Sequence, residues 1–441
     1  MLTTALTAEI VARVAAGRFR GLLASPERAR QLSESSQDMI AHRLLSTLGH
    51  LKGAVMKLGQ MASYMDVGLA ENIRKILADL QDNVPAIDAK QIERVVREDL
   101  GKAPRQLFKQ WSDVQIAAAS IGQVHRAMLK DGTQVAVKVQ YPGIVRALKS
   151  DLSNASIVGS LSSALFRGND SGAMIEEIKD RLLEECDYKL EAENQEYFAS
   201  LYRGDCEILI PKVCRDLSSE RVLTTQLVEG QRFNEYVAHS VQEERNRVGQ
   251  IIYRMAYASI FQHHLFNCDP HPGNYLFLKD GRVAFIDFGC VKRFRPEFIS
   301  QWRDLLCAVL EQDRPRFEQR LLDLRLAPRR EGFDFEYQYR LSLYLYRPWI
   351  YDGPFRYTHD YVLESFRVLG FENPNLFRTN VSKDFVFVNR LQWGLNSVLA
   401  ILNAEANWRK PMLRLLYGED TKKWPPPHRL PTDPQFVPQT Q

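Results

Sequence analysis

Two short segments near the middle of the chain combine carboxylate and amide side chains. The first is Asp269-Pro270-His271-Pro272-Gly273-Asn274, and the second, Asp287-Phe288-Gly289, starts eighteen residues after Asp269. Residues 275–278 and 283–286 have strand-forming composition and flank a turn at Lys279-Asp280-Gly281, so we predict a hairpin between the two segments. A hairpin returns the chain to its starting point, which would direct both segments toward one pocket.

These side chains suit phosphoryl transfer. The reaction needs a carboxylate that orients the accepting hydroxyl or water, which we assign to Asp269, and oxygen ligands for magnesium, which we assign to Asn274 and Asp287. The interval from Asp269 to Asn274 is that of a kinase catalytic loop, although Asn267-Cys268 replaces the usual His-Arg. The alternative is a rigid Pro/Gly turn followed by a strand end. The order of the motifs around a hairpin favours the phosphoryl-transfer interpretation.

Upstream, a lysine on a strand supplies a second part of such a site. Val135-Ala136-Val137-Lys138 follows a turn at residues 130–133, and Lys138 alternates with valines. An ammonium group at this place neutralises the α- and β-phosphates of ATP, whereas a lysine on a solvated strand face is the plain alternative. One hairpin earlier lies an alanine-rich loop, whose predicted phosphate-contacting residues are Ala117, Ala118, Ala119, Ser120, Gly122 and Gln123.

The alanines of this loop have a physical consequence. Glycines let a loop close over phosphates with its N–H groups directed at them, whereas Cβ atoms restrict the backbone angles and hold it further away. We therefore expect altered nucleotide geometry. Residues 225–230 follow a predicted strand at 222–225 and occupy the place of a kinase hinge, so we assign adenine contacts to the backbone of Gln226 and Val228. An ordinary strand-to-loop transition has the same pattern.

The elements that must position these groups change along the chain. Apolar residues recur at helical spacing from about residue 9 to 100, strand patterns follow, and helices are predicted for residues 173–197, 241–264 and most of 296–416. Ile208-Leu209-Ile210 is a further strand candidate. Residues 419–441 are rich in proline and polar side chains, and we predict a disordered tail.

Composition places the chain among globular proteins. It has 441 residues, 45% hydrophobic and 25% charged, and 58 basic against 54 acidic side chains give a net charge of +4, which is too even to argue for nucleic acid. No apolar stretch is long enough to span a bilayer. The six cysteines show no zinc-ligand spacing. The N-terminal segment is predicted to form an amphipathic helix, with contact to a partner or a membrane surface as the alternative.

Taken together, the motifs resemble the UbiB family of atypical kinases, also known as the AarF or ADCK family. The marks of that family stand here in order: Lys57-Leu58-Gly59-Gln60, the alanine loop 117–123, Val135 to Lys138, Glu185-Cys186-Asp187, Glu191-Ala192-Glu193-Asn194, Asp269 to Asn274 and Asp287-Phe288-Gly289. The combination of the Lys-x-Gly-Gln segment with an alanine loop is more specific than any kinase motif alone. The resemblance covers residues 45 to 415.

The resemblance implies an α+β, bilobal, protein-kinase-like fold. The implied parts are an all-helical N-terminal extension at 1–112 with the Lys-x-Gly-Gln helix, an N-lobe at 113–230, a C-lobe at 231–418 and the tail. In the family, that helix folds over the active site and its lysine meets two carboxylates. Lys57 and Gln60 would therefore be regulatory residues with Glu185 and Asp187, and Glu191 would pair with Lys138. By composition alone these are an exposed lysine and an ordinary acidic helix face.

The resemblance further implies ATP and Mg²⁺ as cofactors and a role in isoprenoid-quinone or other lipid metabolism. A small molecule of lipid or quinone chemistry is the expected second partner, with no nucleic acid. The expected location is cytoplasmic, with peripheral membrane contact as an addition. No Ala-Pro-Glu triplet follows Gly289, which argues against a peptide substrate. The alternatives are a protein kinase acting in trans and a nucleotide-binding pseudokinase scaffold.

Overall fold

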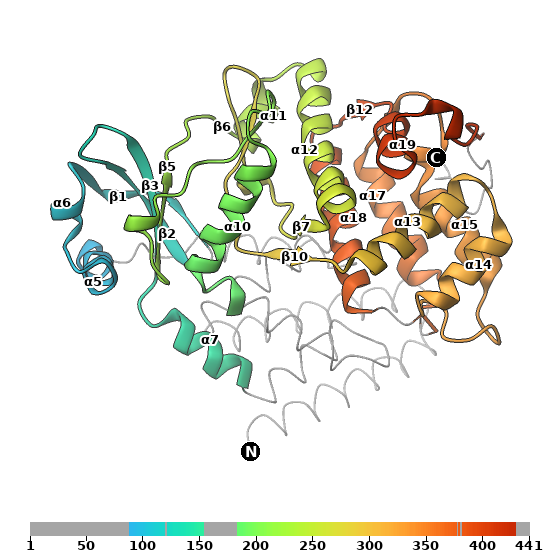
Figure 1. Ribbon diagram of the computed structural model, residues 1–441, viewed down its shortest axis with the longest axis horizontal. Coiled ribbons are helices and arrows are strands. Elements are labelled where there is room, and N and C mark those ends of the chain that lie inside the picture. Colours follow the sequence, from blue (N-terminus) through green and yellow to red (C-terminus); the bar gives the residue numbers. More distant parts are fainter. Residues whose placement is uncertain (1–87, 120, 154–182, 377, 380–381, 429–441) are drawn as a thin grey trace, which may run out of the picture. The chain divides into compact units, whose positions relative to one another are not determined.

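The computed structural model describes the fold of residues 88–119, 121–153, 183–376, 378–379 and 382–428 (Figure 1). These residues divide into two compact units. Unit 1 holds residues 88–130, 137–153 and 183–186 among them, and unit 2 holds 131–136 and everything from 187 onward. Most of the predicted N-terminal extension, with Lys57 and Gln60, lies outside the described residues. In the described ranges no helix is both long and apolar enough to cross a bilayer.

Unit 1 begins with two helices and continues with a β-hairpin. Helix α5 (Ala89–Leu100) buries Ile92, Val95 and Val96 on one face, begins at the Asp88 cap and ends at Gly101, whose φ is 74°. Helix α6 (Pro104–Leu107) leads into strand β1 (Gln110–Ala118), which pairs antiparallel with β2 (Gly122–Met128). Glycine suits the end of α5 because this left-handed conformation is strained for other residues.

The sheet of this hairpin has the order β1-β2-β3-β5. Strand β3 (Gln134–Gln140) is predicted correctly from its alternating valines, and the boundary between the units runs through it. Its first residue belongs to unit 2, where the Leu227 N–H donates to the Gln134 carbonyl beside β5 (Val222–Gln226). Helix α7 (Ile144–Ser153) follows in unit 1.

Unit 2 contains a second sheet with the order β4-β9-β8-β6. Its strands are β4 (Ile208–Leu209), β6 (Gln231–Arg232), β8 (Tyr275–Phe277) and β9 (Val283–Phe285), and β8 and β9 form the predicted antiparallel hairpin. Strand β4 pairs parallel with β9. Residues 187–230, which the sequence assigned to an N-lobe, therefore group with unit 2, because β4 and helix α10 (Tyr188–Leu201) pack there.

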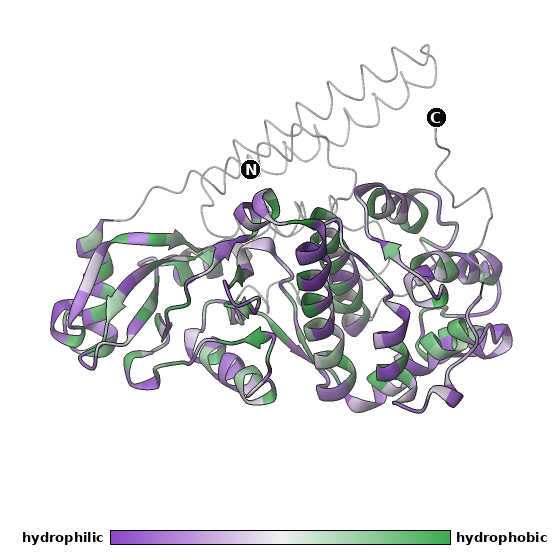
Figure 2. Ribbon diagram, turned by 90° about the horizontal axis from the view of Figure 1, so that it is seen from above, coloured by the Kyte–Doolittle hydropathy of each residue, from purple (hydrophilic) through white to green (hydrophobic). Residues whose placement is uncertain are grey.

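Helices form most of the remainder of unit 2, as the sequence predicts for residues 241–264 and most of 296–416, whereas it does not predict the helix at residues 233–239. They are α11 (Phe233–His239), α12 (Gln242–His263), α13 (Pro296–Leu310), α14 (Arg314–Asp323), α15 (Phe335–Leu345), α16 (Arg347–Ile350), α17 (His359–Phe366), α18 (Lys383–Ile401) and α19 (Arg409–Tyr417). A π-helical turn, Arg367–Phe371, extends α17, and β11 (Phe355–Arg356) pairs with β12 (Glu405–Ala406). Hydrophobic and hydrophilic residues mix along these helices (Figure 2), as expected for helices that each bury one side.

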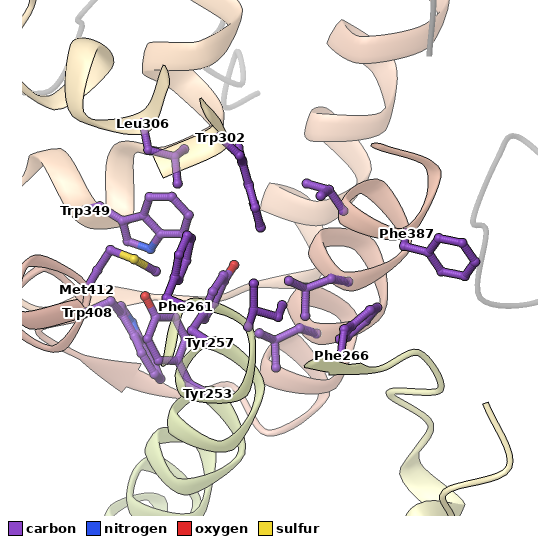
Figure 3. Close-up of a cluster of buried hydrophobic side chains, with 14 of the residues drawn as sticks. Tyr253, Tyr257, Phe261, Phe266, Trp302, Leu306, Trp349, Phe387, Trp408 and Met412 are labelled. Atoms are coloured by element: carbon purple, nitrogen blue, oxygen red, sulfur yellow. The ribbon is translucent and has the colours of Figure 1, made fainter. Parts of the chain in front are cut away.

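Helix α12 is the centre of the unit 2 core. Figure 3 shows Tyr253, Tyr257 and Phe261 of this helix beside aromatic side chains from distant segments. The Tyr253 ring lies 5.0 Å from Trp408, and Tyr257 meets Trp349 edge-on at 5.5 Å between ring centroids. Such edge-on contacts add to the free energy of burial. The core therefore supports the segment with the predicted catalytic motifs, which follows α12 after the short strand at residues 265–267.

The structure differs from the predicted disordered tail at residues 419–428. A short 3₁₀ turn, Thr421–Lys423, follows α19, and the Trp424 indole N–H donates to the Gly418 carbonyl at 3.0 Å. Arg409, with only 2% of its surface exposed, donates to the carbonyls of Pro425 and Trp349. A buried guanidinium needs such acceptors. This need for acceptors explains why the proline segment packs on the helices.

Candidate functional site

The segment from Asp269 to Asn274 forms a closed loop after strand β7 (Leu265–Asn267). Its end is a 3₁₀ turn, Pro272–Asn274, capped by His271, whose Nδ1 accepts from the Gly273 N–H at 2.7 Å. The Asn274 amide donates to the Asp269 backbone carbonyl at 2.9 Å and to the carboxylate Oδ2 at 3.0 Å. His271 thus shapes the loop, while Asn274 holds the carboxylate that we predict to be the base.

The Asp287 segment is tied to the same loop by backbone pairing. Strand β10 (Val291–Arg293) pairs antiparallel with β7, and the Cys268 N–H donates to the Cys290 carbonyl at 2.8 Å. The β8–β9 hairpin joins the other ends of the two segments. The two motifs are therefore neighbours in unit 2, as the hairpin prediction requires.

Asn267 joins the two motifs through a contact that the sequence reasoning did not predict. Its Nδ2 donates to the Asp287 backbone carbonyl at 2.8 Å, so it connects the residue before the catalytic loop to the predicted metal ligand. The Asp287 carboxylate itself accepts from the Gly289 N–H at 3.0 Å. The signal was present in the sequence, because Asn267 occupies the place of the kinase histidine, two residues before the base.

Phe288 attaches the Asp287 segment to helix α10. It is fully buried, its ring lies 5.0 Å from Phe198 of α10, and its carbonyl accepts from the Asn194 amide at 3.3 Å. Helix α10 also carries Glu191, which is 1% exposed. A carboxylate this buried requires a polar or charged partner. The sequence proposes Lys138, which lies in unit 1 on β3, half-buried between Val137 and Val139, both fully buried.

Asp187 has a structural task that its predicted regulatory role did not include. It caps α10, and its Oδ1 accepts from the N–H groups of Lys189 and Leu190 at 3.0 and 3.2 Å. Glu185 is 9% exposed. Because Lys57 and Gln60 lie outside the described residues, their predicted contact with these carboxylates stays a prediction.

The alanine loop is a tight turn at the end of a strand. Ala117 and Ala118 still belong to β1, where they pair with Val124 and Gln123, and the Ala119 N–H donates to the Gly122 carbonyl at 2.8 Å. Ser120 lies outside the described residues. The turn is the β1–β2 connection, which is where the motif order predicts a phosphate-binding loop.

The side chain of Gln123 is engaged inside unit 1. It is 2% exposed, and its Nε2 lies 2.9 Å from Nε2 of His125, whose Nδ1 lies 2.9 Å from the Ser112 carbonyl. The His125 ring stacks on Trp111 at 4.8 Å. Burial lowers the pKa of His125. A neutral ring that donates from Nδ1 and accepts at Nε2 satisfies both neighbours. Nucleotide contacts by Gln123 would therefore involve its backbone.

In the predicted hinge segment, one backbone group already forms a hydrogen bond within the protein. The Gln226 N–H donates to the Lys212 carbonyl at 2.8 Å. Of its two backbone groups, Gln226 therefore has only the carbonyl left for the predicted contact with adenine, whereas Val228 lies beyond the strand.

A small pocket lies beside the catalytic loop within unit 2. Asp269 and Asn274 lie at its wall, and most of the remaining lining is apolar, including Phe198, Ile252, Met255, Phe266, Tyr275 and Leu395. Burial raises the pKa of Tyr275, and the charge of Asp269 raises it further. The phenol is therefore neutral at physiological pH. Apolar walls strengthen the interactions of a nearby carboxylate by excluding water.

Asn274 and Asp287 are the two predicted metal ligands in this loop system. Among the described residues, no group of three His, Cys, Asp or Glu side chains is placed to hold a metal ion. Magnesium that arrives with a nucleotide would need only one or two protein oxygens, with phosphates and water as its other ligands. Asn274 uses its amide nitrogen on Asp269, so its carbonyl oxygen would be the metal ligand, together with the Asp287 carboxylate.

Comparison with known proteins identifies this arrangement. Residues 79–321, more than half of the chain, match the model of the ABC1 atypical kinase-like domain. The chain belongs to the ABC1 atypical kinase-like family. This membership confirms the resemblance to the UbiB, AarF and ADCK proteins and a kinase-like domain of mixed helix and sheet.

Relatives of this chain include proteins named as mitochondrial atypical kinases. The rat (Rattus norvegicus) protein named atypical kinase COQ8B is 31% identical over 65% of this chain and 54% of its own length. Atypical kinase COQ8 of Saccharomyces cerevisiae is 30% identical over 64% of this chain and 56% of its own. The chain therefore spans about half the length of these curated relatives.

A solved structure resembles most of this chain. It is the Mycobacterium tuberculosis protein Rv3197 in complex with erythromycin, which is 28% identical, with a TM-score of 0.65 over 88% of this chain and 98% of that one. The fold is thus shared beyond the matched domain, into the C-terminal helices.

Proposed function

We propose that this chain is a magnesium-dependent, ATP-binding enzyme that transfers the γ-phosphoryl group of ATP to water or to a small, lipid-like acceptor. The observation that carries the proposal is the Asp269 carboxylate, held by Asn274 next to the Asp287 segment. A base, an amide and a second carboxylate in one connected loop system are what phosphoryl transfer requires.

Each residue has a defined task in this proposal. Asp269 accepts the proton of the attacking hydroxyl or water. At the same time the oxygen of that hydroxyl or water bonds to the γ-phosphorus, and the bond between the γ-phosphorus and ADP breaks. Asn274 and Asp287 would hold magnesium, which supplies charge neutralisation at the phosphates. Lys138 contacts the α- and β-phosphates, and the backbone of the 117–123 turn and of Val228 contacts the rest of the nucleotide.

The acceptor is proposed to be small because the Ala-Pro-Glu triplet, which is typical of the peptide-docking part of a protein kinase, does not follow Gly289. Membership of a family that includes the COQ8 atypical kinases supports isoprenoid-quinone or other lipid metabolism as the proposed setting. Peripheral membrane contact stays a prediction from the sequence. The intact set Lys138, Asp269, Asn274 and Asp287 argues against a pseudokinase scaffold, which has no need of a base. Transfer of labelled phosphate to a protein acceptor would instead favour a protein kinase acting in trans.

The test is an ATPase assay on the full chain with magnesium, with and without anionic liposomes. We expect Asp269→Ala to lower turnover by about a thousandfold and Asp287→Asn to abolish the magnesium-dependent part of ATP binding. Asp280→Asn is the matched control, because Asp280 is a carboxylate on the β8–β9 turn that pairs only locally, with Arg282. Residual turnover that is insensitive to Asp269→Ala would contradict the proposal and revive the scaffold.

A further inference from the structure

Helix α18 contacts the catalytic loop although it lies outside the matched family domain. The domain match ends at residue 321, whereas α18 covers Lys383–Ile401. Arg390 on this helix places its Nη2 3.3 Å from Oδ1 of Asp269, and the two side chains are only 22% and 19% exposed. A guanidinium from a segment 121 residues away thus reaches the proposed base.

The Asp269 carboxylate is consequently held at both oxygens. Asn274 donates to Oδ2 at 3.0 Å, and Arg390 interacts with Oδ1 at 3.3 Å. A carboxylate with one such contact can rotate about its last torsion, whereas two contacts from different elements fix its plane. Arginine suits this task because it carries its charge at all physiological pH values.

One helical turn further on, α18 approaches the catalytic loop without space for a side chain. A Cβ atom added to Gly394 would lie 2.2 Å from Cγ of Pro270, the residue directly after the base. Arg390 and Gly394 are four residues apart and share one helix face. The Pro270 ring of the loop therefore rests on the same helix face that delivers the guanidinium.

The N-terminal end of α18 is fixed to the other motif. Asp384 and Lys292 form an ion pair at 3.0 Å with both side chains 15% exposed, and Lys292 also lies 5.1 Å from the ring centroid of Phe387. Lys292 belongs to β10, which follows the Asp287 segment and pairs with β7. Helix α18 is thus attached to both chain segments that carry the proposed base and metal ligand.

We propose that Arg390 is a positioning residue that orients the Asp269 carboxylate, with α18 as its rigid support. This inference rests on the proposed function and deepens it, because it makes a C-terminal helix part of the catalytic machinery. Arg390 acts through Asp269, so its loss should lower kcat and leave nucleotide affinity unchanged. A misplaced catalytic group about 1 Å from its proper position costs about a hundredfold in rate.

The experiment measures kcat and, separately, the Kd for magnesium-ATP on the full chain. We expect Arg390→Ala to lower kcat about a hundredfold and Arg390→Lys about tenfold, with Kd changed less than about twofold. Added guanidinium ion should restore part of the rate of Arg390→Ala and none of the rate of Asp269→Ala. Gly394→Ala, which keeps Arg390 but displaces the loop, should lower kcat about tenfold.

Two controls separate positioning from folding. Arg414→Ala removes an arginine that is 58% exposed on α19, and Gly249→Ala places a Cβ 2.8 Å from that of Ala404 in the core. We expect both to keep kcat, and Gly249→Ala to lower Tm.

Unchanged kcat in folded Arg390→Ala, equal losses in kcat and affinity, or the absence of guanidinium rescue would overturn the inference. A wild-type protein that does not hydrolyse ATP would instead overturn the proposed function, and the inference with it.

Discussion

The catalytic loop of unit 2 and the alanine turn of unit 1 are held in opposite ways. Asp269 and Asp287 are fixed by Asn267 and Asn274, which flank Asp269 in one segment, and by Arg390 from the distant helix α18. The alanine turn is closed mainly by bonds between residues 119 and 122 and by pairing of its own two strands, with one bond from further along the chain, from the Tyr141 N–H to the Ile121 carbonyl at 2.9 Å. Local contacts tolerate substitution because few other elements depend on them. We therefore expect changes in the loop of unit 2 to have large effects and changes in the turn to have small ones.

The largest effect is expected from Phe288→Ala. Loss of this fully buried ring from its contact with Phe198 should destabilise unit 2 by about 3–5 kcal/mol. Urea unfolding measured by circular dichroism tests this expectation. Trp111→Ala is the matched change in unit 1, where the ring is only half-buried, and it should cost clearly less. Equal losses in the two variants would contradict the comparison.

Asn267→Ala should come next. The variant loses the bond to the Asp287 carbonyl and leaves that backbone oxygen without this donor, which should lower kcat about thirtyfold. Steady-state ATPase measurements check the expectation. Asn373→Ala removes a similar side-chain bond to a backbone carbonyl, that of Leu369, and should leave kcat unchanged. Wild-type turnover in Asn267→Ala would show that the link between the motifs is dispensable.

A pH-dependent effect is expected in unit 1. Burial lowers the pKa of His125 below its ordinary value of 6.5, and a bond to the Ser112 carbonyl and the charge of Asp113 only partly oppose this. The folded state then binds fewer protons than the unfolded state, so its stability is complete above pH 6.5 and falls as the pH drops toward the lowered pKa. His125→Phe, which keeps a ring against Trp111, should flatten this dependence in urea titrations between pH 5 and 7.5. A variant that parallels wild type would contradict a neutral His125.

The smallest effect is expected from Ala119→Gly. Removing this Cβ relaxes the turn over the phosphates, which should change the preference between ATP and ADP by a few-fold and raise autophosphorylation. Nucleotide affinities from calorimetry and phosphate transfer from labelled ATP provide the measurement. If neither quantity changes, the alanines do not control nucleotide geometry.

The sequence determined those structural elements that depend only on residues close together in the chain. The alternating valines predict β3, the turn at residues 279–281 predicts the β8–β9 hairpin, and the intervals between motif residues predict the neighbourhood of Asp269 and Asp287. Each of these follows from the periodicity of a strand or from the geometry of a short turn. The family resemblance could be recognised for the same reason, because its marks are short and ordered along the chain.

Only the tertiary structure decided which distant residues complete the site. The Arg390 guanidinium beside Asp269 and the close approach of Gly394 to Pro270 have no local signature. In sequence, α18 has the pattern of an ordinary core helix, and the residues after 418 have that of a solvated tail. Contacts between residues more than a hundred positions apart depend on how helices pack, and hydrophobic periodicity specifies the buried face of a helix but not its partner.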